Sequence, residues 1–257
     1  MSTSKTITVG GKTISRVGLG TNRLENTSAN REFLSGAVNA GIGMIDSAHL
    51  YTSGESEKTI GAALAPFADD LVIATKGGFH SGAPEKVRAE IEQSLESLNT
   101  ETIGLWYLHR VDDKVPVEET LGAVKEFVDA GRIEHVGLSQ VDAATVELGA
   151  SVLPIAAVQN GYNLDEREYD SLIDHCEKHE IAFVPFFPLR GGDKSQLEEI
   201  GRRYEISAQQ VKLAWLLRRS PAVLPIPGTL HLDHLKGNLA TLDVELTDED
   251  YAALWPA

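Results

Sequence analysis

Short apolar runs alternate along the chain with longer stretches in which an apolar residue recurs every three or four positions. Eight runs are predicted as strands: 14–20, 43–48, 71–76, 103–109, 135–139, 155–160, 181–187 and 223–228. Helical periodicity predicts helices at 30–39, 55–65, 84–98, 117–130, 143–150, 166–179 and 208–219. Apolar strands that alternate with amphipathic helices indicate a parallel sheet covered by helices. Eight such units in 257 residues match a (β/α)8 TIM barrel.

The ends of the chain add two smaller elements to this barrel. Residues 7–15 are predicted as a hairpin that turns at Gly10-Gly11 and closes the bottom of the barrel. Residues 246–255 are predicted as a short capping helix. No Pro-, Gly- or Ser-rich linker interrupts the pattern, so we expect a single domain over residues 1–257.

Composition limits the possible partners. Acidic side chains outnumber basic ones by 38 to 23, and the resulting formal charge of −15 opposes binding to nucleic acid and to anionic membrane surfaces. No apolar run approaches the roughly 20 residues of a membrane-spanning helix. Cys176 is the only cysteine, and the N-terminal residues lack the apolar core of a signal peptide. We therefore expect a cytoplasmic protein.

Three motif-like segments do not carry the chemistry that they suggest. Gly10-Gly11-Lys12-Thr13 lacks the earlier glycine of a phosphate-binding loop, and Gly18-Leu19-Gly20 does not continue as G-x-G-x-x-G. His175 and His179 have the spacing of a zinc pair, but no third ligand is apparent, and Cys176 fits the buried face of a helix. We expect no metal site.

Four polar residues stand where three consecutive strands are predicted to end. Asp46 ends the second run and Tyr51 follows it, while Lys76 ends the third run and His109 the fourth. The carboxyl ends of barrel strands share one mouth, so these side chains are expected to meet. An ammonium ion at Lys76 would favour the phenolate form of Tyr51, and Asp46 would keep Lys76 charged. His109 could donate a hydrogen bond to a carbonyl oxygen.

Each of these residues also has a simpler interpretation. An aspartate after a strand is often a helix cap, and a lysine there often extends to solvent. A histidine at a strand end is often structural. The argument for acid–base chemistry rests on their joint occurrence at one mouth.

Motifs along nearly the whole chain resemble the aldo-keto reductase superfamily. They are GLGTNRL, GIGMIDSAHLYTSGESE, ATKGG, YLHR, HVGLS, VQNGYN, PFFPL, IPGT and HLKGN, in this order. Asp46 and Tyr51 keep the family's interval of five residues, and Lys76 and His109 its interval of 33. The resemblance implies that these four residues form a catalytic tetrad with Tyr51 as the general acid. It also implies reversible hydride transfer between a nicotinamide cofactor and an aldehyde or ketone.

The same resemblance suggests which residues contact the cofactor. Gly20 and Thr21 are expected beside the nicotinamide, Ser139 and Gln159 at its carboxamide, and Phe186 on its ring. Leu189 is expected beside the pyrophosphate. The adenosine end is assigned to Ile226, Gly228, Thr229, His234 and Asn238.

Two positions depart from the family pattern. Gln140 stands where asparagine is usual. Many members read the 2′-phosphate with a lysine and an arginine, and these positions hold Gly228 and His234 here. Arg190, Lys236 or His231 could replace that charge. We expect NADPH as the cofactor, and NADH is not excluded.

The preferred interpretation is a monomeric carbonyl reductase, and two other functions stay open. Lys76 could instead be the nucleophile of a Schiff-base lyase on the same barrel. The barrel could also be a nucleotide-sensing binding module with negligible turnover. The paired Asp46 argues against the lyase, and the intact tetrad argues against the sensor.

Overall fold

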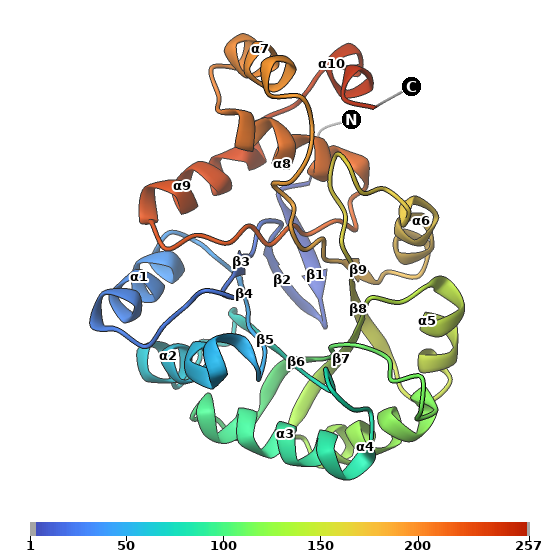
Figure 1. Cartoon of the computed structure of the whole chain (residues 1–257). Helices are drawn as coiled ribbons and strands as arrows, with labels where there is room; N and C mark the ends of the chain where they lie inside the picture. The colour runs from blue at the N-terminus through green and yellow to red at the C-terminus, as the bar shows by residue number, and fades with distance from the viewer. Residues whose placement is uncertain (1–3, 256–257) are drawn as a thin grey trace.

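Parallel strands surrounded by helices form the body of the protein (Figure 1). The computed structural model describes residues 4–255, so both ends of the expected 1–257 domain lie outside the described residues. Seven strands form one parallel sheet in the order β3 to β9. They are β3 Leu19–Gly20, β4 Met44–Asp46, β5 Val72–Gly77, β6 Ile103–Leu108, β7 Ile133–Ser139, β8 Ile155–Gln159 and β9 Ala182–Phe183. The predicted (β/α)8 barrel is confirmed.

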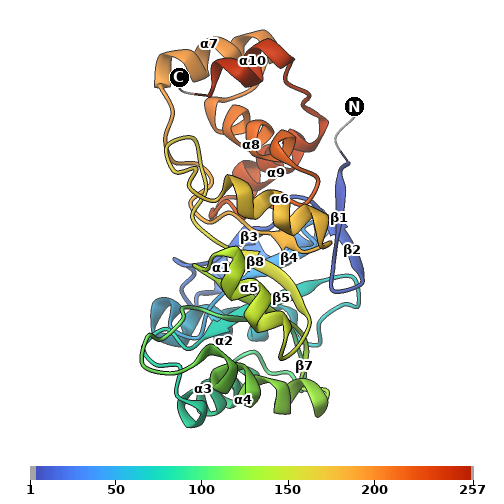
Figure 2. The same ribbon diagram turned by 90° about the vertical axis from the view of Figure 1, so that its right-hand side faces the viewer.

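Most helices follow the strands and cover the outside of the barrel (Figures 1 and 2). The helices are α1 Ser28–Asn39, α2 Glu55–Leu64, α3 Pro84–Ser97, α4 Val117–Asp129, α5 Ala143–Ala150, α6 Asp170–Lys178, α7 Lys194–Tyr204, α8 Ala208–Arg219, α9 Leu232–Ala240 and α10 Asp248–Ala253. Of these, α7 and α10 lie beyond α8. Short 3-10 helices are η1 Tyr51–Gly54 and η2 Thr241–Asp243. Within residues 4–255, no helix is both long enough and apolar enough to cross a membrane.

Two helical expectations needed correction. The predicted helix 166–179 begins only at Asp170, because the Asn163 side chain accepts hydrogen bonds from the backbone of Asp165 and Glu166 and holds a turn there. Helix α7 was not predicted. Its segment is mostly polar and buries only Leu197, Ile200 and Gly201, so few apolar residues mark it as a helix.

The eighth predicted strand, 223–228, was wrong as a regular strand. The segment closes the barrel through isolated parallel bridges, Phe183 to Val223 on one side and Gly20 to Gly228 on the other. Pro225 and Pro227 have no N–H group, so the segment cannot form a continuous ladder. Both prolines instead accept hydrogen bonds at their carbonyl groups, from Gly18 at 3.0 Å and Gly20 at 3.4 Å.

The hairpin β1 Thr6–Val9 and β2 Lys12–Ser15 covers the end of the barrel where the strands begin, as predicted (Figure 1). Val9 and Ile14 pack into the interior of the barrel. The turn lies against His135 at the start of β7, so close that a Cβ on Gly10 would fall 2.0 Å from the imidazole ring. The bottom of the barrel is therefore closed, and the opposite mouth is left for a site.

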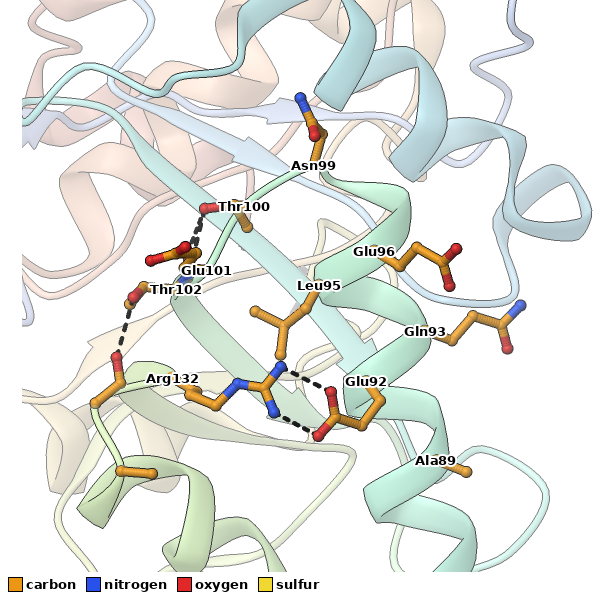
Figure 3. A pocket seen from close by; sticks show the side chains of 12 residues that line it. Ala89, Glu92, Gln93, Leu95, Glu96, Asn99, Thr100, Glu101, Thr102 and Arg132 are labelled. Carbon is orange, nitrogen blue, oxygen red and sulfur yellow. Dashed lines mark hydrogen bonds and ion pairs between the residues drawn. The ribbon is translucent and has the colours of Figure 1, made fainter.

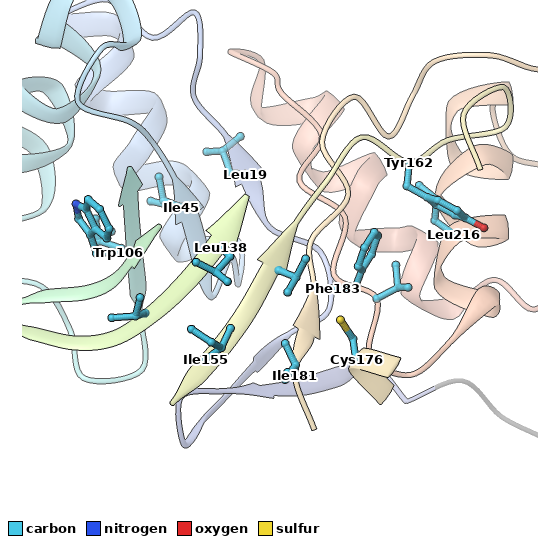
Figure 4. Close-up of a cluster of buried hydrophobic side chains, with 14 of the residues drawn as sticks. Leu19, Ile45, Trp106, Leu138, Ile155, Tyr162, Cys176, Ile181, Phe183 and Leu216 are labelled. Carbon is cyan, nitrogen blue, oxygen red and sulfur yellow. The ribbon is translucent and has the colours of Figure 1, made fainter. Parts of the chain in front are cut away.

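Alternate residues of each strand pack on opposite sides of the sheet. On β6, Leu105 and Tyr107 point into the barrel, whereas Trp106 and Leu108 pack outward. Outward residues from several strands and helices form the larger core; Figure 4 shows Leu19, Ile45, Trp106, Leu138, Ile155 and Phe183 among them. The inner cluster is smaller and ends beneath the mouth.

Candidate active site

The carboxyl ends of the strands bring together polar side chains that are far apart in the sequence. Asp46 ends β4, Lys76 lies next to the end of β5, and His109 directly follows β6. Ser139 and Gln159 end β7 and β8. Because parallel barrel strands end at the same mouth, these side chains share one site.

Lys76 and Asp46 form an ion pair inside the protein. Lys76 Nζ donates to Asp46 Oδ1 at 2.6 Å and to the Ser47 carbonyl at 2.6 Å. The exposed fractions of the two side chains are 1% and 2%. Burial alone would lower the pKa of Lys76, but the charge of Asp46 and the interactions with Tyr51 outweigh burial, so that the pKa is raised. Lys76 is therefore held as an ammonium ion.

Tyr51 is placed over this ion pair by a tight turn. Its hydroxyl lies 3.4 Å from Lys76 Nζ, which is 4.9 Å from the centroid of the Tyr51 ring. Thr52 and Ser53 follow with φ angles of 47° and 56°, a region that residues with a side chain rarely adopt. The Thr52 hydroxyl donates to the Leu24 carbonyl at 2.8 Å and holds the turn. Strained backbone of this kind clusters at functional sites.

Gln159 holds the second oxygen of Asp46. Its Nε2 donates to Asp46 Oδ2 at 2.8 Å, while Oδ1 accepts from Lys76. Each oxygen of the buried carboxylate thus has a donor, which offsets the loss of hydration. Gln159 was expected only as a cofactor contact, and it also belongs to this hydrogen-bonded cluster.

His109 is a neutral imidazole at the same mouth. Burial, and then the charge of Lys76, lower the pKa of His109 to about 3. Its ring packs edge-on against Tyr51 and Phe79, with centroids 6.0 Å and 5.0 Å away. Within residues 4–255, Nδ1 is buried without a hydrogen-bond partner. A buried N–H without an acceptor is costly, so the proton is best placed on Nε2, which becomes a donor.

A cavity of about 560 Å³ opens at this mouth, and an adjoining cavity of about 260 Å³ extends it. The larger one contains the predicted residues Gly20, Thr21, Asp46, Tyr51, His109, Ser139, Gln159, Phe186, Leu189, Arg190, Ile226 and Gly228. The smaller one adds Thr229 and His234. Lys76 lies behind Tyr51 and lines neither cavity. Asn238 is buried on α9 and also lines neither, so its cofactor contact stays a prediction.

Several cavity residues were missed as site residues in the sequence analysis. They are Asn22, Arg23, Leu50, Phe79, Gln140, Phe187, Pro188 and Pro227. Most lie in loops after the strand ends, where periodicity does not tell which side chains face inward. Phe187 and Pro227 instead fall in segments that were predicted as strands. Gln140 had a local signal, its replacement of an asparagine. It has a φ of 58°, and its Nε2 donates to the His109 carbonyl at 3.4 Å.

A larger hollow of about 1350 Å³ lies at the other end of the barrel, between α3 and the residues that precede β6 and β7 (Figure 3). Arg132 crosses it and pairs with Glu92 on α3, and the Thr102 hydroxyl donates to the Gly131 carbonyl at 3.0 Å. Side chains at the amino-terminal face of a barrel usually serve stability. This hollow is an open surface groove, and we do not assign the chemistry to it.

The histidine pair on α6 lacks a set of metal ligands. The rings of His175 and His179 lie 4.4 Å apart. No group of three or more His, Cys, Asp or Glu side chains placed to hold a metal occurs within residues 4–255. Burial raises the pKa of the Cys176 thiol to about 12, which makes it a poor ligand and nucleophile.

Comparison with known proteins places this barrel in a family. A sequence profile of the Aldo/keto reductase family matches residues 16–255. The chain belongs to the aldo/keto reductase family. The resemblance seen in the motifs is thereby confirmed. Members of this family are oxidoreductases that act on small-molecule carbonyl compounds.

Relatives of this aldo/keto reductase span nearly its whole length. An uncharacterized oxidoreductase of Schizosaccharomyces pombe is 34% identical over 271 residues, 97% of this chain and 88% of that protein. Pyridoxine 4-dehydrogenase of Escherichia coli is 32% identical over 279 residues, 98% and 97% of the two chains. The solved structure of a Klebsiella pneumoniae aldo-keto reductase in complex with NADPH superposes with a TM-score of 0.87 at 27% identity, covering 97% and 93%.

The lowered pKa of His109 predicts a pH dependence of stability. The ordinary pKa is 6.5 and the folded pKa about 3, so between these pH values the unfolded chain binds a proton that the folded chain does not. This stabilisation is complete above pH 6.5 and is lost as the pH falls toward 3. The free energy of unfolding, measured in urea titrations, should fall between pH 7 and pH 5 in the unmodified protein. In His109→Gln this fall should be ~2 kcal/mol smaller. The exposed His179→Gln is the control, and equal slopes for all three proteins would contradict the assignment.

Proposed function

We propose that this aldo/keto reductase reversibly reduces aldehydes or ketones with NADPH, with Tyr51 as the general acid. The observation that carries the proposal is the buried Lys76 ammonium, which contacts both the Asp46 carboxylate and the Tyr51 hydroxyl behind a cavity. When bound, NADPH supplies the hydride that forms the new C–H bond at the carbonyl carbon. The protein supplies the proton and positions the reactants.

Tyr51 gives its proton to the carbonyl oxygen and becomes a phenolate. Lys76, 3.4 Å away and charged, stabilises the negative charge that develops on the Tyr51 oxygen. Asp46 in turn keeps Lys76 charged. His109 is neutral and donates from Nε2 to the carbonyl oxygen, which orients that oxygen toward Tyr51. In the reverse direction, the phenolate accepts the proton of the alcohol.

The two adjoining cavities fit an elongated anionic dinucleotide. The protein as a whole is strongly acidic, yet Arg23 and Arg190 line the larger cavity. Of the described residues that line this cavity, Asp46 alone has an acidic side chain, and its charge is balanced by Lys76. The pyrophosphate of a cofactor therefore meets a net positive environment in a negative protein.

We assign the cofactor contacts along these cavities from the reacting end to the adenosine end. Ser139 and Gln159 hold the carboxamide, Phe186 packs on the nicotinamide ring, and Gly20 and Thr21 lie beside it. Leu189 and Arg190 contact the pyrophosphate. Ile226, Gly228, Thr229 and His234 hold the adenosine end. Asn238, buried on α9, is assigned there from the family resemblance alone.

NADPH is proposed over NADH with a modest preference. In support, the Klebsiella pneumoniae relative was crystallised with NADPH. His231 and His234 lie at the smaller cavity with ring centroids 5.1 Å apart, and both can donate hydrogen bonds to a phosphate. The absence of a lysine and an arginine at Gly228 and His234 is why the preference is modest.

The Schiff-base lyase is disfavoured by the surroundings of Lys76. A nucleophilic lysine must be neutral and must reach the substrate. The pKa of Lys76 is instead raised by Asp46 and Tyr51 against the opposing effect of burial, and the side chain is only 1% exposed. The nucleotide-sensing module is disfavoured because the four groups needed for turnover occupy one site.

The substrate is proposed to be a flat aromatic or heteroaromatic aldehyde. The Escherichia coli relative is named for oxidation of pyridoxine, a substituted pyridine. Phe79 lies against His109 and lines the cavity together with Leu50 and Phe187. Hydrogen bonds from Gly78 N to Glu90 at 2.6 Å and from Gly82 N to Asp112 at 2.9 Å hold the Phe79 loop in place.

We further propose a cytoplasmic monomer. Within residues 4–255, the exposed large apolar side chains are Phe79, Leu148, Phe187 and Leu230. Three of these line the cavities, which leaves Leu148 as a single apolar residue elsewhere. A broad apolar face for a permanent partner is therefore not formed by the described residues. The cysteine, Cys176, is buried and free, as is usual in a reducing compartment.

Removing the Tyr51 hydroxyl tests the reaction. We expect Tyr51→Phe to lower kcat/KM at least ~100-fold, because the general acid is lost. Its NADPH affinity, measured by quenching of tryptophan fluorescence, is expected to stay within about threefold, since the ring remains. Tyr169→Phe, on the outside of the barrel, is the control. Nearly unchanged turnover, or trapping of a carbonyl substrate on Lys76 by borohydride, would refute the proposed chemistry.

Placing a guanidinium group at position 234 tests the proposed contact with the 2′-phosphate at the adenosine end. We expect His234→Arg to raise the ratio of NADPH affinity to NADH affinity about tenfold, because one charge-assisted contact to the 2′-phosphate is gained. His179→Arg adds the same charge directly after α6 and is the matched control. An unchanged ratio in fluorescence titrations would show that His234 does not face the 2′-phosphate.

Shortening Phe79 tests the substrate class. The measured quantity is the ratio of kcat/KM for benzaldehyde to that for cyclohexanecarbaldehyde, compared between variants so that intrinsic reactivity cancels. We expect Phe79→Leu to lower this ratio about two- to tenfold, the worth of one aromatic contact. Leu148→Ala should leave it unchanged. A ratio equal to that of the unmodified protein would remove Phe79 from the substrate site.

A further inference from the structure

Tyr107 lies inside the barrel, directly beneath the mouth. It is fully buried and packs in the inner cluster with aliphatic side chains from neighbouring strands. Its hydroxyl has no hydrogen-bond partner within residues 4–255. Buried hydroxyl groups are nearly always paired, and phenylalanine would fill the same space without an unpaired group. The hydroxyl therefore requires an explanation other than packing.

The barrel makes room for this ring. Gly137 is the register partner of Tyr107 on β7, and a Cβ there would lie 2.4 Å from the Tyr107 ring. The next residue across, on β8, is the small Ala157. Two neighbouring strands thus carry small residues where the tyrosine side chain lies.

Tyr107 contacts the proposed catalytic cluster from below. It is the register partner of Lys76 on β5, and Lys76 Nζ lies 5.8 Å from its ring centroid. Burial raises the pKa of Tyr107 well above its ordinary 10, the charge of Asp46 raises it further, and the nearby Gln159 side chain opposes this less strongly. The phenol thus stays protonated beside Gln159 and near Asp46.

The side-chain amide of Gln159 has two possible hydrogen-bond partners. Its Nε2 donates to Asp46 Oδ2, and its side chain also lines the cavity in which the nicotinamide carboxamide is proposed to bind. If the amide turns to a ligand, Asp46 Oδ2 loses its donor, and a buried carboxylate with an unpaired oxygen is less stable as an anion. The neighbouring Tyr107 O–H is a donor without another partner.

We propose that Tyr107 is a positioning residue that donates its hydroxyl hydrogen to Asp46 when Gln159 turns toward the bound cofactor. This inference rests on the proposed function. The substitute hydrogen bond keeps Asp46 ionised and therefore keeps Lys76 charged during the reaction. It also frees Gln159 to bind the carboxamide. No proton leaves Tyr107, because the phenol acts only as a hydrogen-bond donor.

Tyr107→Phe removes only this hydroxyl and tests the inference in three ways. We expect the dissociation constant for NADPH, from fluorescence titration, to rise about fivefold, because Gln159 can leave Asp46 only by exposing an unpaired oxygen. We expect kcat to fall about tenfold with little change in KM for the carbonyl substrate. The alkaline limb of the kcat profile should also move, because the hydroxyl no longer takes part in the ionisation of the Asp46–Lys76 pair.

Stability separates this role from a structural one. Tyr107→Phe should unfold at the same or a higher urea concentration than the unmodified protein, since its hydroxyl is unpaired when folded. Tyr162→Phe is the matched control, because its buried hydroxyl donates to Asp170 Oδ1 at 2.5 Å. That control should be less stable, with an unchanged alkaline limb.

The outcomes distinguish this inference from the proposed function. A folded Tyr107→Phe protein with the NADPH affinity, kcat and pH profile of the unmodified protein overturns the positioning role and leaves the reductase intact. If the variant does not fold, the hydroxyl supports the fold and the inference is also overturned. An unmodified protein that reduces no carbonyl compound with NADPH refutes the proposed function itself.

Discussion

The buried ion pair between Lys76 and Asp46 is the interaction on which the site depends. Two charges without water are unfavourable unless they meet at short distance and have further hydrogen bonds. Adjacent parallel strands, β4 and β5, bring them together, and Ser47, Tyr51 and Gln159 supply the remaining contacts. The strands beneath must hold their register for these contacts to form. The geometry of the polar site therefore depends on the packing of the apolar barrel below it.

Closure of the barrel is achieved partly by side chains. The segment from Val223 to Gly228 contains two prolines and cannot pair as a full strand. The buried guanidinium of Arg16 compensates on one side, because it donates to the carbonyl groups of Leu217 and Ser220 at 2.7 Å and of Val223 at 3.2 Å. The irregular segment also leaves Ile226 and Gly228 at the cavities. Irregularity thus falls on the same edge as the site.

Charge is distributed unevenly between surface and site. A net charge of −15 favours solubility and repels polyanions, while the cavity is lined by Arg23 and Arg190, and the charge of Asp46 there is balanced by Lys76 behind it. An anionic dinucleotide is attracted only where the charge changes sign. His109 is neutral and adds a hydrogen-bond donor to the site. A positively charged His109 would instead repel the Lys76 ammonium ion.

The alternation of apolar strands and amphipathic helices was enough to predict the barrel, because periodicity reports which faces are buried. Family motifs located Asp46, Tyr51, Lys76 and His109, whose spacing is a local property. Tertiary structure alone decided which residues are in contact: Gln159 donates a hydrogen bond to Asp46 across 113 positions, and Tyr107 lies beside Lys76 on the neighbouring strand. It also decided that Pro225 and Pro227 break the last strand and that Phe79 faces the cavity. Such contacts depend on packing between distant segments, which no single stretch of sequence records.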